Sequence, residues 1–371
     1  GTCNGNEMKL NPLYQAFIDA GEEAGYPTTD DYNGYRQEGF GPMHMTVDGG
    51  VRASTSNAHL RPALKRPNLT LISGVLTRKV LLDGKTATGI EYQQGGSIKT
   101  ATARKEVILS AGSIGSPQLL QLSGVGRAQD LQPHGIEVRH DLPGVGQNLQ
   151  DHLDFTLAYK TRDKDNFGIS LAAGAKLLRE VMEWRRTGRS MIATPFAEGA
   201  AFLKTMPELG RPDVQLHFVL SIVDDHARKL HLGHGISCHV CLLRPKSRGS
   251  VSLASADPLA APVIDPQFLA ERDDLDGLMR GVRLTRRIMA QAPLADYLAK
   301  ELFIDAEPDD AALERHIRAR ADTIYHPVGS CRMGTDAQAV VDPELRVHGL
   351  RNLRVVDASV MPRLIGGNTN A

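Results

Sequence analysis

The sequence predicts a mixed α/β and α+β protein, made of a partial Rossmann-like domain and an α+β domain that contains an antiparallel sheet. A short apolar run at residues 107–111 leads into a turn of small residues and a helix start, as in α/β units. After residue 156, alternating strands are mixed with segregated helices, which is typical of an α+β domain. A second short buried strand then returns the chain to the first domain. We therefore predict domains at residues 1–155 and 156–323, with residues 324–371 returning to the first domain.

The individual elements follow from local patterns. Residues 11–21 carry apolar side chains at helical spacing, with an early proline and a glycine near the stop. Residues 39–50 are loop-like, and a glycine- and proline-rich stretch at 141–152 marks the domain boundary. Further helices are expected at residues 52–64, 118–122, 171–188 and 274–291. Alternating or continuous apolar runs predict strands at residues 68–72, 75–82, 89–92, 101–106, 107–111, 212–223, 235–243, 250–253 and 353–357.

Composition narrows the class of protein. A chain of 371 residues is long enough for two domains, each with its own core. Lysine plus arginine equals aspartate plus glutamate at 43 each, so no basic field favours nucleic acid. The 4 cysteines are scattered, no apolar run approaches the roughly 20 residues of a membrane span, and we expect no secretory leader. We therefore expect a soluble, cytoplasmic protein.

His326 is the main candidate for proton transfer. Pro327 biases the histidine toward an extended conformation, and Gly329 and Gly334 allow sharp turns beside it. An imidazole accepts a proton near neutral pH because its ordinary pKa is about 6.5. A Gly-Gly-Asn-Thr-Asn loop at residues 366–370 supplies a second polar group. A histidine in a loop is more often structural, so these residues alone leave both interpretations open.

The turn that follows residue 111 is a candidate ligand contact. Gly112 and Ser113 begin a turn of small residues that opens a helix, an arrangement that presents backbone N–H groups to an anionic or polar ligand. An ordinary connection between a strand and a helix is the common alternative. The residues alone do not decide between the two.

Several motifs together resemble one family. The sequence reads HPVGSCRMG at residues 326–334, LRVVDASVMP at 353–362 and GGNTNA at 366–371. These stretches resemble the C-terminal signature of the glucose-methanol-choline (GMC) oxidoreductases, and GSIGSPQLLQLSGVG at residues 112–126 resembles their second signature. The stretch DYNGYRQEGFGPM at residues 31–43 is similar to the bacterial choline dehydrogenase and aliphatic alcohol dehydrogenase group.

The resemblance implies an FAD-dependent oxidation of an alcohol, choline-like or primary aliphatic or aromatic, to an aldehyde. His326 would take the hydroxyl proton while hydride passes to the flavin, and Asn368 would hydrogen-bond the substrate oxygen. The resemblance leaves three points open: whether oxygen or a quinone reoxidises the flavin, whether the protein associates peripherally with the inner membrane, and whether it forms a homo-oligomer. It also places Asn148, Asp151 and His152 beside the flavin as secondary candidates. Its main cofactor contacts are Leu76, Gly112, Ser113, Asp357, Ala358, Met361, Pro362, Thr369 and Asn370.

Glu198 is the residue that the resemblance assigns to the substrate. It matches a glutamate that faces the trimethylammonium group in choline-oxidising relatives, and non-choline alcohol dehydrogenases share it. A structural glutamate bonded to backbone donors is an equal alternative. Aromatic residues make up 5% of the chain, so an aromatic cage for a cation is not evident.

The nucleotide-binding fingerprint of the family is not found. No Gly-x-Gly-x-x-Gly follows an apolar strand, and residues 124–126 and 144–146 lack the third glycine. We therefore expect a chain cut at both ends, without the first FAD-binding segment. Such a chain would bind FAD weakly or not at all, and an inactive fragment is one alternative function. A flavoprotein lyase that cleaves hydroxynitriles is the other.

Two further groups resemble metal or redox sites, and no metal is expected at either. Cys238 and Cys241 form a C-x-x-C pair, but the alternation around them favours a half-buried strand over zinc or a dithiol. His226, His231 and His234 cluster near two aspartates in an expected loop, where solvated histidines are the usual case.

Overall fold

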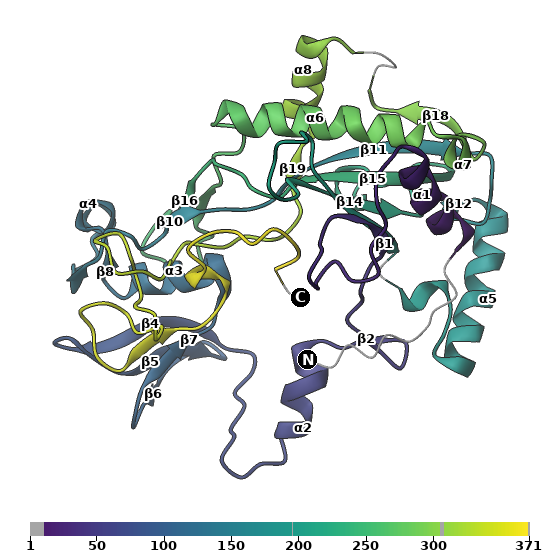
Figure 1. The fold of residues 1–371 in the computed structure, drawn as a ribbon. Helices are drawn as coiled ribbons and strands as arrows, with labels where there is room; N and C mark the ends of the chain where they lie inside the picture. Colours follow the sequence, from purple (N-terminus) through teal and green to yellow (C-terminus); the bar gives the residue numbers. More distant parts are fainter. Residues whose placement is uncertain (1–10, 195, 305–307, 370–371) are drawn as a thin grey trace. The chain divides into compact units, whose positions relative to one another are not determined.

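The computed structural model describes residues 11–194, 196–304 and 308–369, and the chain separates into two compact units (Figure 1). The first unit extends to Leu71 and includes Leu153–Leu243 and Leu275–Asp322. The second unit comprises Ile72–His152, Arg244–Asp274 and the chain from Thr323 onward. The residues before Leu71 therefore group with the middle of the chain, whereas the sequence pattern groups them with the strand-turn-helix segment. The assignment of flavin and substrate domains stays a prediction.

The first unit is built on an antiparallel sheet whose strand order is β1-β13-β14-β15-β11-β18. Its central strands are buried along nearly their whole length, which is why they read as almost continuous apolar runs. The strands of this unit are β1 (Gly39–Pro42), β2 (Val47–Asp48), β3 (Val51–Arg52), β11 (Leu153–Thr161), β12 (Gly168–Ile169), β13 (Ala197–Leu203), β14 (Val214–Val219), β15 (Gly233–Leu242), β18 (Leu298–Leu302) and β19 (Asp322–Thr323).

Helix α6 (Arg272–Met289) packs closely on this sheet because two of its glycines face it. On α6, Gly277 and Gly281 lie four residues apart and so share one face of the helix. A Cβ atom added to Gly281 would come within 2.9 Å of a methyl carbon of Val240. The helical segments of the unit are α1 (Pro12–Glu23), η1 (Ser56–Leu60), α2 (Arg61–Ala63), α5 (Leu171–Thr187), η3 (Met191–Ala193), η4 (Asp225–Ala227), α6 (Arg272–Met289), α7 (Ala292–Ala295) and α8 (Asp310–Arg320).

The predicted helices at 11–21, 171–188 and 274–291 are confirmed. The side chain of Asn11 caps α1 by accepting from the amide of Leu13, and Pro12 occupies the first turn. The buried face of α1 carries Phe17, whose ring stacks on Phe218 of β14 at a centroid distance of 4.6 Å. Helix α5 ends at Gly188 in the left-handed conformation, as a glycine C-cap does.

The second unit combines an antiparallel meander, β4-β5-β6, with a parallel pair, β7 and β20. Val107 of β7 is in register with Leu353 of β20, so the two predicted short buried strands are neighbours despite their separation in sequence. The elements are β4 (Leu76–Asp83), β5 (Thr86–Gln94), β6 (Ser97–Thr102), β7 (Val107–Leu109), α3 (Gly112–Leu122), β8 (Val125–Gly126), α4 (Ala128–Leu131), η2 (Gln132–His134), β9 (His140–Asp141), β10 (Gln147–Leu149), β16 (Gly249–Ser252), β17 (Val263–Asp265), β20 (Leu353–Val355) and η5 (Ala358–Val360).

Three local predictions were wrong. Residues 68–72 form no strand and are exposed, because apolar residues without a strand partner do not make one. Residues 39–50 are not all loop, since Gly39–Pro42 pairs with β13, a long-range contact that local sequence does not reveal. Helix α3 begins at Gly112, well before the predicted residue 118.

Helix α3 tolerates its internal proline because another group replaces the missing hydrogen bond. Pro117 has no N–H to donate to the carbonyl of Ser113, four residues earlier. The hydroxyl of Ser330 donates to that carbonyl instead, at 2.5 Å. The turn of small residues is therefore continuous with the helix. In the described part of the chain, no helix combines the length and hydrophobicity required to cross a bilayer.

Candidate functional site

His326 lies in a strained and firmly anchored turn of the second unit. The preceding residue, Tyr325, has a φ of 67°, a left-handed conformation that is uncommon for a residue with a bulky side chain. The amide of His326 donates to the carboxylate of Asp151 at 2.9 Å, and the hydroxyl of Thr323 donates to the same carboxylate. The backbone beneath the imidazole is thus fixed by a buried carboxyl group.

The imidazole ring of His326 faces a second histidine and an amide. Its Nδ1 lies 3.0 Å from Nδ1 of His152, and the two rings are almost perpendicular, at 89°. Its Nε2 lies 3.5 Å from the side-chain nitrogen of Asn368, which is the outer limit of a hydrogen bond. The structure therefore brings together His326 and Asn368, the two residues predicted to act on the substrate.

The chain after His326 is tied to helix α3 and to the segment before β11. The hydroxyl of Ser113 donates to the carbonyl of Pro327 at 2.6 Å, so this predicted cofactor contact also supports the histidine turn. Gly329 has a φ of 91°, and a Cβ atom there would come within 2.6 Å of the carbonyl oxygen of Asn148. Only glycine fits this position.

Gln150 positions the loop that carries Asn368. Its side-chain nitrogen donates to the carbonyl of Pro362 at 3.3 Å, and its side-chain oxygen accepts from the amide of Leu364 at 3.2 Å. Gln150 is 2% exposed, so both hydrogen bonds form away from water, where such bonds restrict motion most. The amide of Asn368 is therefore presented from an anchored loop.

Asp357 joins strand β20 to the start of helix α3. Its carboxylate accepts from the amide of Gly112 at 3.0 Å and from the hydroxyl of Ser116 at 2.5 Å. It also accepts from the amide of Ser359 at 2.8 Å, which caps the short helix η5. The predicted contacts Gly112, Asp357 and Ala358 consequently form one continuous surface.

Gly112 leaves the backbone at the start of α3 open to a ligand. Gly112 has a φ of 79°, and a Cβ atom built on it would meet no heavy atom within 4 Å. Ala111, at the N-cap position of α3, offers no capping side chain, but the carboxylate of Asp357 accepts from the first helical amide, that of Gly112. A backbone position without a side chain lets a flat ligand approach the chain closely.

The other predicted cofactor residues lie as follows. Leu76 is half-buried at the start of β4, in register with Gln93. Met361 and Thr369 are half-buried, and Pro362 is exposed. Asn370 lies outside the described residues.

The secondary candidates have supporting contacts in this structure. Asn148 has a φ of 64° and donates to the carbonyl of Gly329 at 3.2 Å. Asp151 and His152 contact His326 itself. Sequence reasoning gave these residues only a place near a cofactor, and the signal that could have identified them is the polar run Gln-Asn-Leu-Gln-Asp-His in a domain crossing. The roles of Gln150 and Ser330 were missed altogether.

Burial sets the charge state of the candidate base. It lowers the pKa of His326 below the ordinary value, because desolvation penalises the imidazolium form. The imidazole is therefore neutral near pH 7 and carries a lone pair.

Burial shifts the pKa of Glu198 in the opposite direction. This residue belongs to β13 in the first unit and is 6% exposed. Desolvation raises the pKa of this carboxyl, and a hydrogen bond with the side chain of Thr194 opposes the shift only in part.

The raised pKa of Glu198 predicts that Glu198→Gln changes the pH dependence of stability. The folded state favours the neutral carboxyl, so its stabilising contribution is complete below the unfolded pKa of about 4.3 and is lost as pH rises through the raised folded value. The stability of the parent protein relative to Glu198→Gln should therefore fall as pH rises above about 4, measured as urea midpoints. Glu208→Gln, an exposed change in the same unit, is the control. A relative stability that rises with pH would contradict this burial argument.

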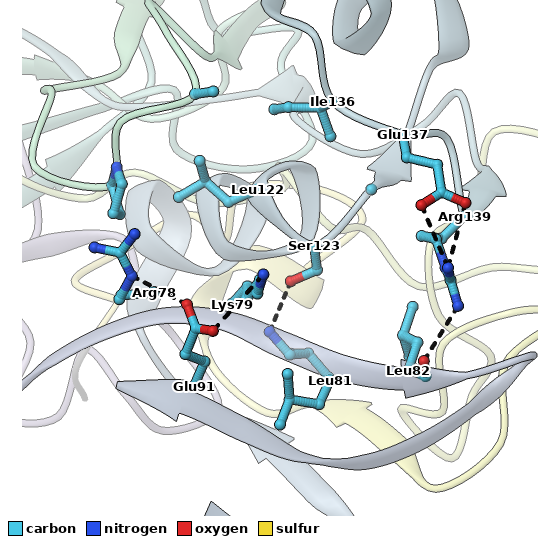
Figure 2. A pocket seen from close by; sticks show the side chains of 14 residues that line it. Arg78, Lys79, Leu81, Leu82, Glu91, Leu122, Ser123, Ile136, Glu137 and Arg139 are labelled. Carbon is cyan, nitrogen blue, oxygen red and sulfur yellow. Dashed lines mark hydrogen bonds and ion pairs between the residues drawn. The ribbon is translucent and has the colours of Figure 1, made fainter. Parts of the chain in front are cut away.

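A separate cavity of about 380 Å³ lies in the second unit (Figure 2). Its charged groups are already paired: Arg78 with Glu91 at 3.1 Å, and Arg139 with Glu137 at 3.3 Å. Its wall includes residues at the C-terminal end of α3, whereas the histidine turn contacts the N-terminal end. An 11-residue helix is about 16 Å long, and none of the predicted site residues lines this cavity.

The C-x-x-C pair lies in strand β15, as predicted, but the strand is more fully buried than expected. Cys238 and Cys241 are each 0% exposed, and burial raises the pKa of Cys238, which makes it a poor nucleophile. In the described ranges, no group of three or more His, Cys, Asp or Glu side chains is arranged to hold a metal. The three clustered histidines contact different partners: His226 with Asp322, His231 with Asp224 and His234 with Asn166.

Comparison with known proteins shows which families and proteins this chain is similar to. Two family models, both described as GMC oxidoreductase, match residues 4–154 and 245–371. An oxygen-dependent choline dehydrogenase from Photobacterium profundum is 46% identical over 374 residues, covering 100% of this chain and 66% of the relative. An alcohol dehydrogenase (acceptor) from Pseudomonas putida is 43% identical over 366 residues, covering 98% and 66%. The chain thus spans 66% of the length of these relatives.

Solved structures share the fold. Pyridoxine 4-oxidase from Mesorbium loti matches with a TM-score of 0.84 and 28% identity, covering 97% of this chain and 67% of that chain. A formate oxidase from Aspergillus oryzae, described with its FAD modification, matches with a TM-score of 0.89 and 27% identity, covering 96% and 67%.

Proposed function

This chain belongs to the GMC oxidoreductase family, and on that premise we propose that, with FAD bound, it oxidises an alcohol to an aldehyde. The observation that carries the proposal is the pair His326 and Asn368, with imidazole Nε2 and amide nitrogen 3.5 Å apart. To react, an alcohol hydroxyl needs one group that accepts its proton and one that holds its oxygen. A neutral imidazole beside an amide donor supplies both.

The surface around the start of α3 would hold the cofactor. Gly112 and Ala358 line that surface, and Leu76, Met361 and Thr369 would complete the contacts. When bound, FAD supplies the acceptor for the hydride that leaves the carbinol carbon. The side chain of Asp357 keeps the amide of Gly112 and the short helix η5 in place beneath it.

His326 would act as the base. Burial keeps the imidazole neutral, so it can take the hydroxyl proton of the substrate as the C–H bond breaks. The amide of Asn368 cannot titrate and would orient the substrate oxygen by donating a hydrogen bond to it. Anchoring of both groups, through Asp151 and Gln150, reduces the cost of aligning them.

The substrate class rests on Glu198 and on the names of the relatives. One relative is a choline dehydrogenase and another an alcohol dehydrogenase, so both choline and a primary alcohol are candidates. A cationic substrate beside Glu198 would favour its charged form and reverse the shift that burial imposes. The electrons would pass on to oxygen or to a quinone. A quinone acceptor calls for peripheral contact with a membrane.

The pH dependence of kcat/KM tests the role of His326. The ratio kcat/KM reports the ionisations of the free protein. Its fall at acid pH therefore follows the lowered pKa of His326, and the midpoint of that fall should lie below about pH 6.5. Activity is complete above that value and is lost as pH falls and the imidazole takes up a proton. Choline and 1-butanol are suitable probes, measured with the FAD-loaded protein. An acid limb above the ordinary histidine pKa would show that another group is titrating.

A further inference from the structure

His152 is the buried neighbour of the candidate base. It is 0% exposed, and two of its ring contacts run through different nitrogen atoms. Its Nε2 lies 3.0 Å from the carbonyl oxygen of Ile365, and its Nδ1 lies 3.0 Å from Nδ1 of His326. The first contact determines which nitrogen donates the hydrogen bond in the second.

A carbonyl oxygen can only accept a hydrogen bond, so Nε2 of His152 must carry a proton. A neutral imidazole has one N–H, which leaves Nδ1 of His152 with a lone pair. Two nitrogens at 3.0 Å cannot both present lone pairs, so Nδ1 of His326 must be the donor. Nε2 of His326 is then the unprotonated nitrogen.

A doubly protonated His152 would reverse this order, and burial opposes it. Such a ring would carry a full charge with 0% exposure, which is costly in the protein interior. A separate contact supports the same assignment. The amide nitrogen of Asn368, a donor, faces Nε2 of His326 at 3.5 Å, an arrangement that suits a lone pair on that nitrogen.

We propose that His152 is a positioning residue that fixes the tautomer of His326, with the proton on Nδ1 and the lone pair on Nε2. This inference rests on the proposed function for its catalytic meaning. When the substrate O–H bond breaks, the proton forms an N–H bond at Nε2, while the Nδ1–H bond stays on His326. The lone pair of His152 then receives a stronger hydrogen bond from the imidazolium, which stabilises the charge that develops.

Ring nitrogen NMR measures the tautomer without any reaction. In the ¹⁵N-histidine-labelled protein at a pH where His326 is neutral, we expect its Nε2 signal in the unprotonated region and its Nδ1 signal in the protonated region. The spectrum of His326→Gln assigns both signals. A protonated Nε2 overturns the proposal, whatever the protein does with alcohols.

Two variants separate positioning from folding. His152→Leu removes the acceptor, whereas His152→Asn offers its side-chain oxygen at about the position of Nδ1. We expect His152→Leu to populate the Nε2–H tautomer and to lower kcat for choline or 1-butanol at least about 10-fold with little change in KM. His152→Asn should restore both the NMR pattern and the rate. If His152→Leu fails to fold, the parent spectrum and His152→Asn still decide, because an asparagine variant with a protonated Nε2 on His326 contradicts the proposal.

An unchanged tautomer of His326 in a folded His152→Leu protein would also refute the proposed positioning role of His152. Absence of alcohol oxidation in the parent protein, together with an unprotonated Nε2, would instead count against the proposed function alone.

Discussion

His326→Ala should lower the rate of flavin reduction by alcohol about 10²–10⁴-fold in the FAD-loaded protein, the range that removal of a general base produces. The imidazole is the neutral group whose Nε2 faces the amide of Asn368, so its removal takes away the group positioned to accept the hydroxyl proton. Anaerobic stopped-flow absorbance of the flavin, with choline and 1-butanol, measures the rate directly.

His59→Ala is the matched control, since His59 is an exposed histidine of the first unit. Its rate should equal that of the parent protein. Free imidazole added to the His326→Ala protein should raise the rate, because it supplies the missing base to the space left by the side chain. A His326→Ala protein that is reduced as fast as the parent would remove His326 from the chemistry.

Asp357→Ala should lower the free energy of unfolding by about 3 kcal/mol, because hydrogen bonds to a charged acceptor contribute about 1.5–3 kcal/mol each and are not additive. The carboxylate accepts from Gly112, Ser116 and Ser359, and Ser116 is 0% exposed, so its hydroxyl would be left buried without this acceptor. The loss should appear as a lower urea midpoint, and FAD should bind less tightly because the start of α3 is no longer held.

Asp336→Ala is the matched control for this change. Asp336 also accepts from a backbone amide and from the guanidinium of Arg332, but its side chain is largely exposed. Surface ion pairs contribute little, so the midpoint should hardly move. Equal losses from Asp336→Ala and Asp357→Ala would mean that Asp357 is not a structural centre of the second unit.

Local sequence was sufficient to predict the elements whose ends depend on neighbouring residues alone. Helix α1 has its N-cap at Asn11 and helix α5 its C-cap at Gly188, and both follow from neighbouring residues alone. The buried runs of β7 and β20 were also identified, although their parallel pairing needed the fold. The GMC resemblance gave the family, which the family models confirm.

Contacts between distant residues explain what was missed. The ring of His152 meets that of His326 across 174 positions, and Ser330 donates to Ser113 across 217. The four-residue strand β1 exists only because β13 pairs with it, so its glycine-rich sequence read as a loop. Burial likewise cannot be read from spacing, and burial is what lowers the pKa of His326.

The direct test of alcohol oxidation at this site is anaerobic mixing of the FAD-loaded protein with an alcohol, recorded at the flavin absorbance band. We predict that choline or 1-butanol bleaches the flavin, and that deuterium on the carbinol carbon slows the bleaching because the C–H bond breaks in that step. A flavin that stays oxidised with both alcohols, while a hydroxynitrile is cleaved without bleaching, would contradict the account and indicate a lyase.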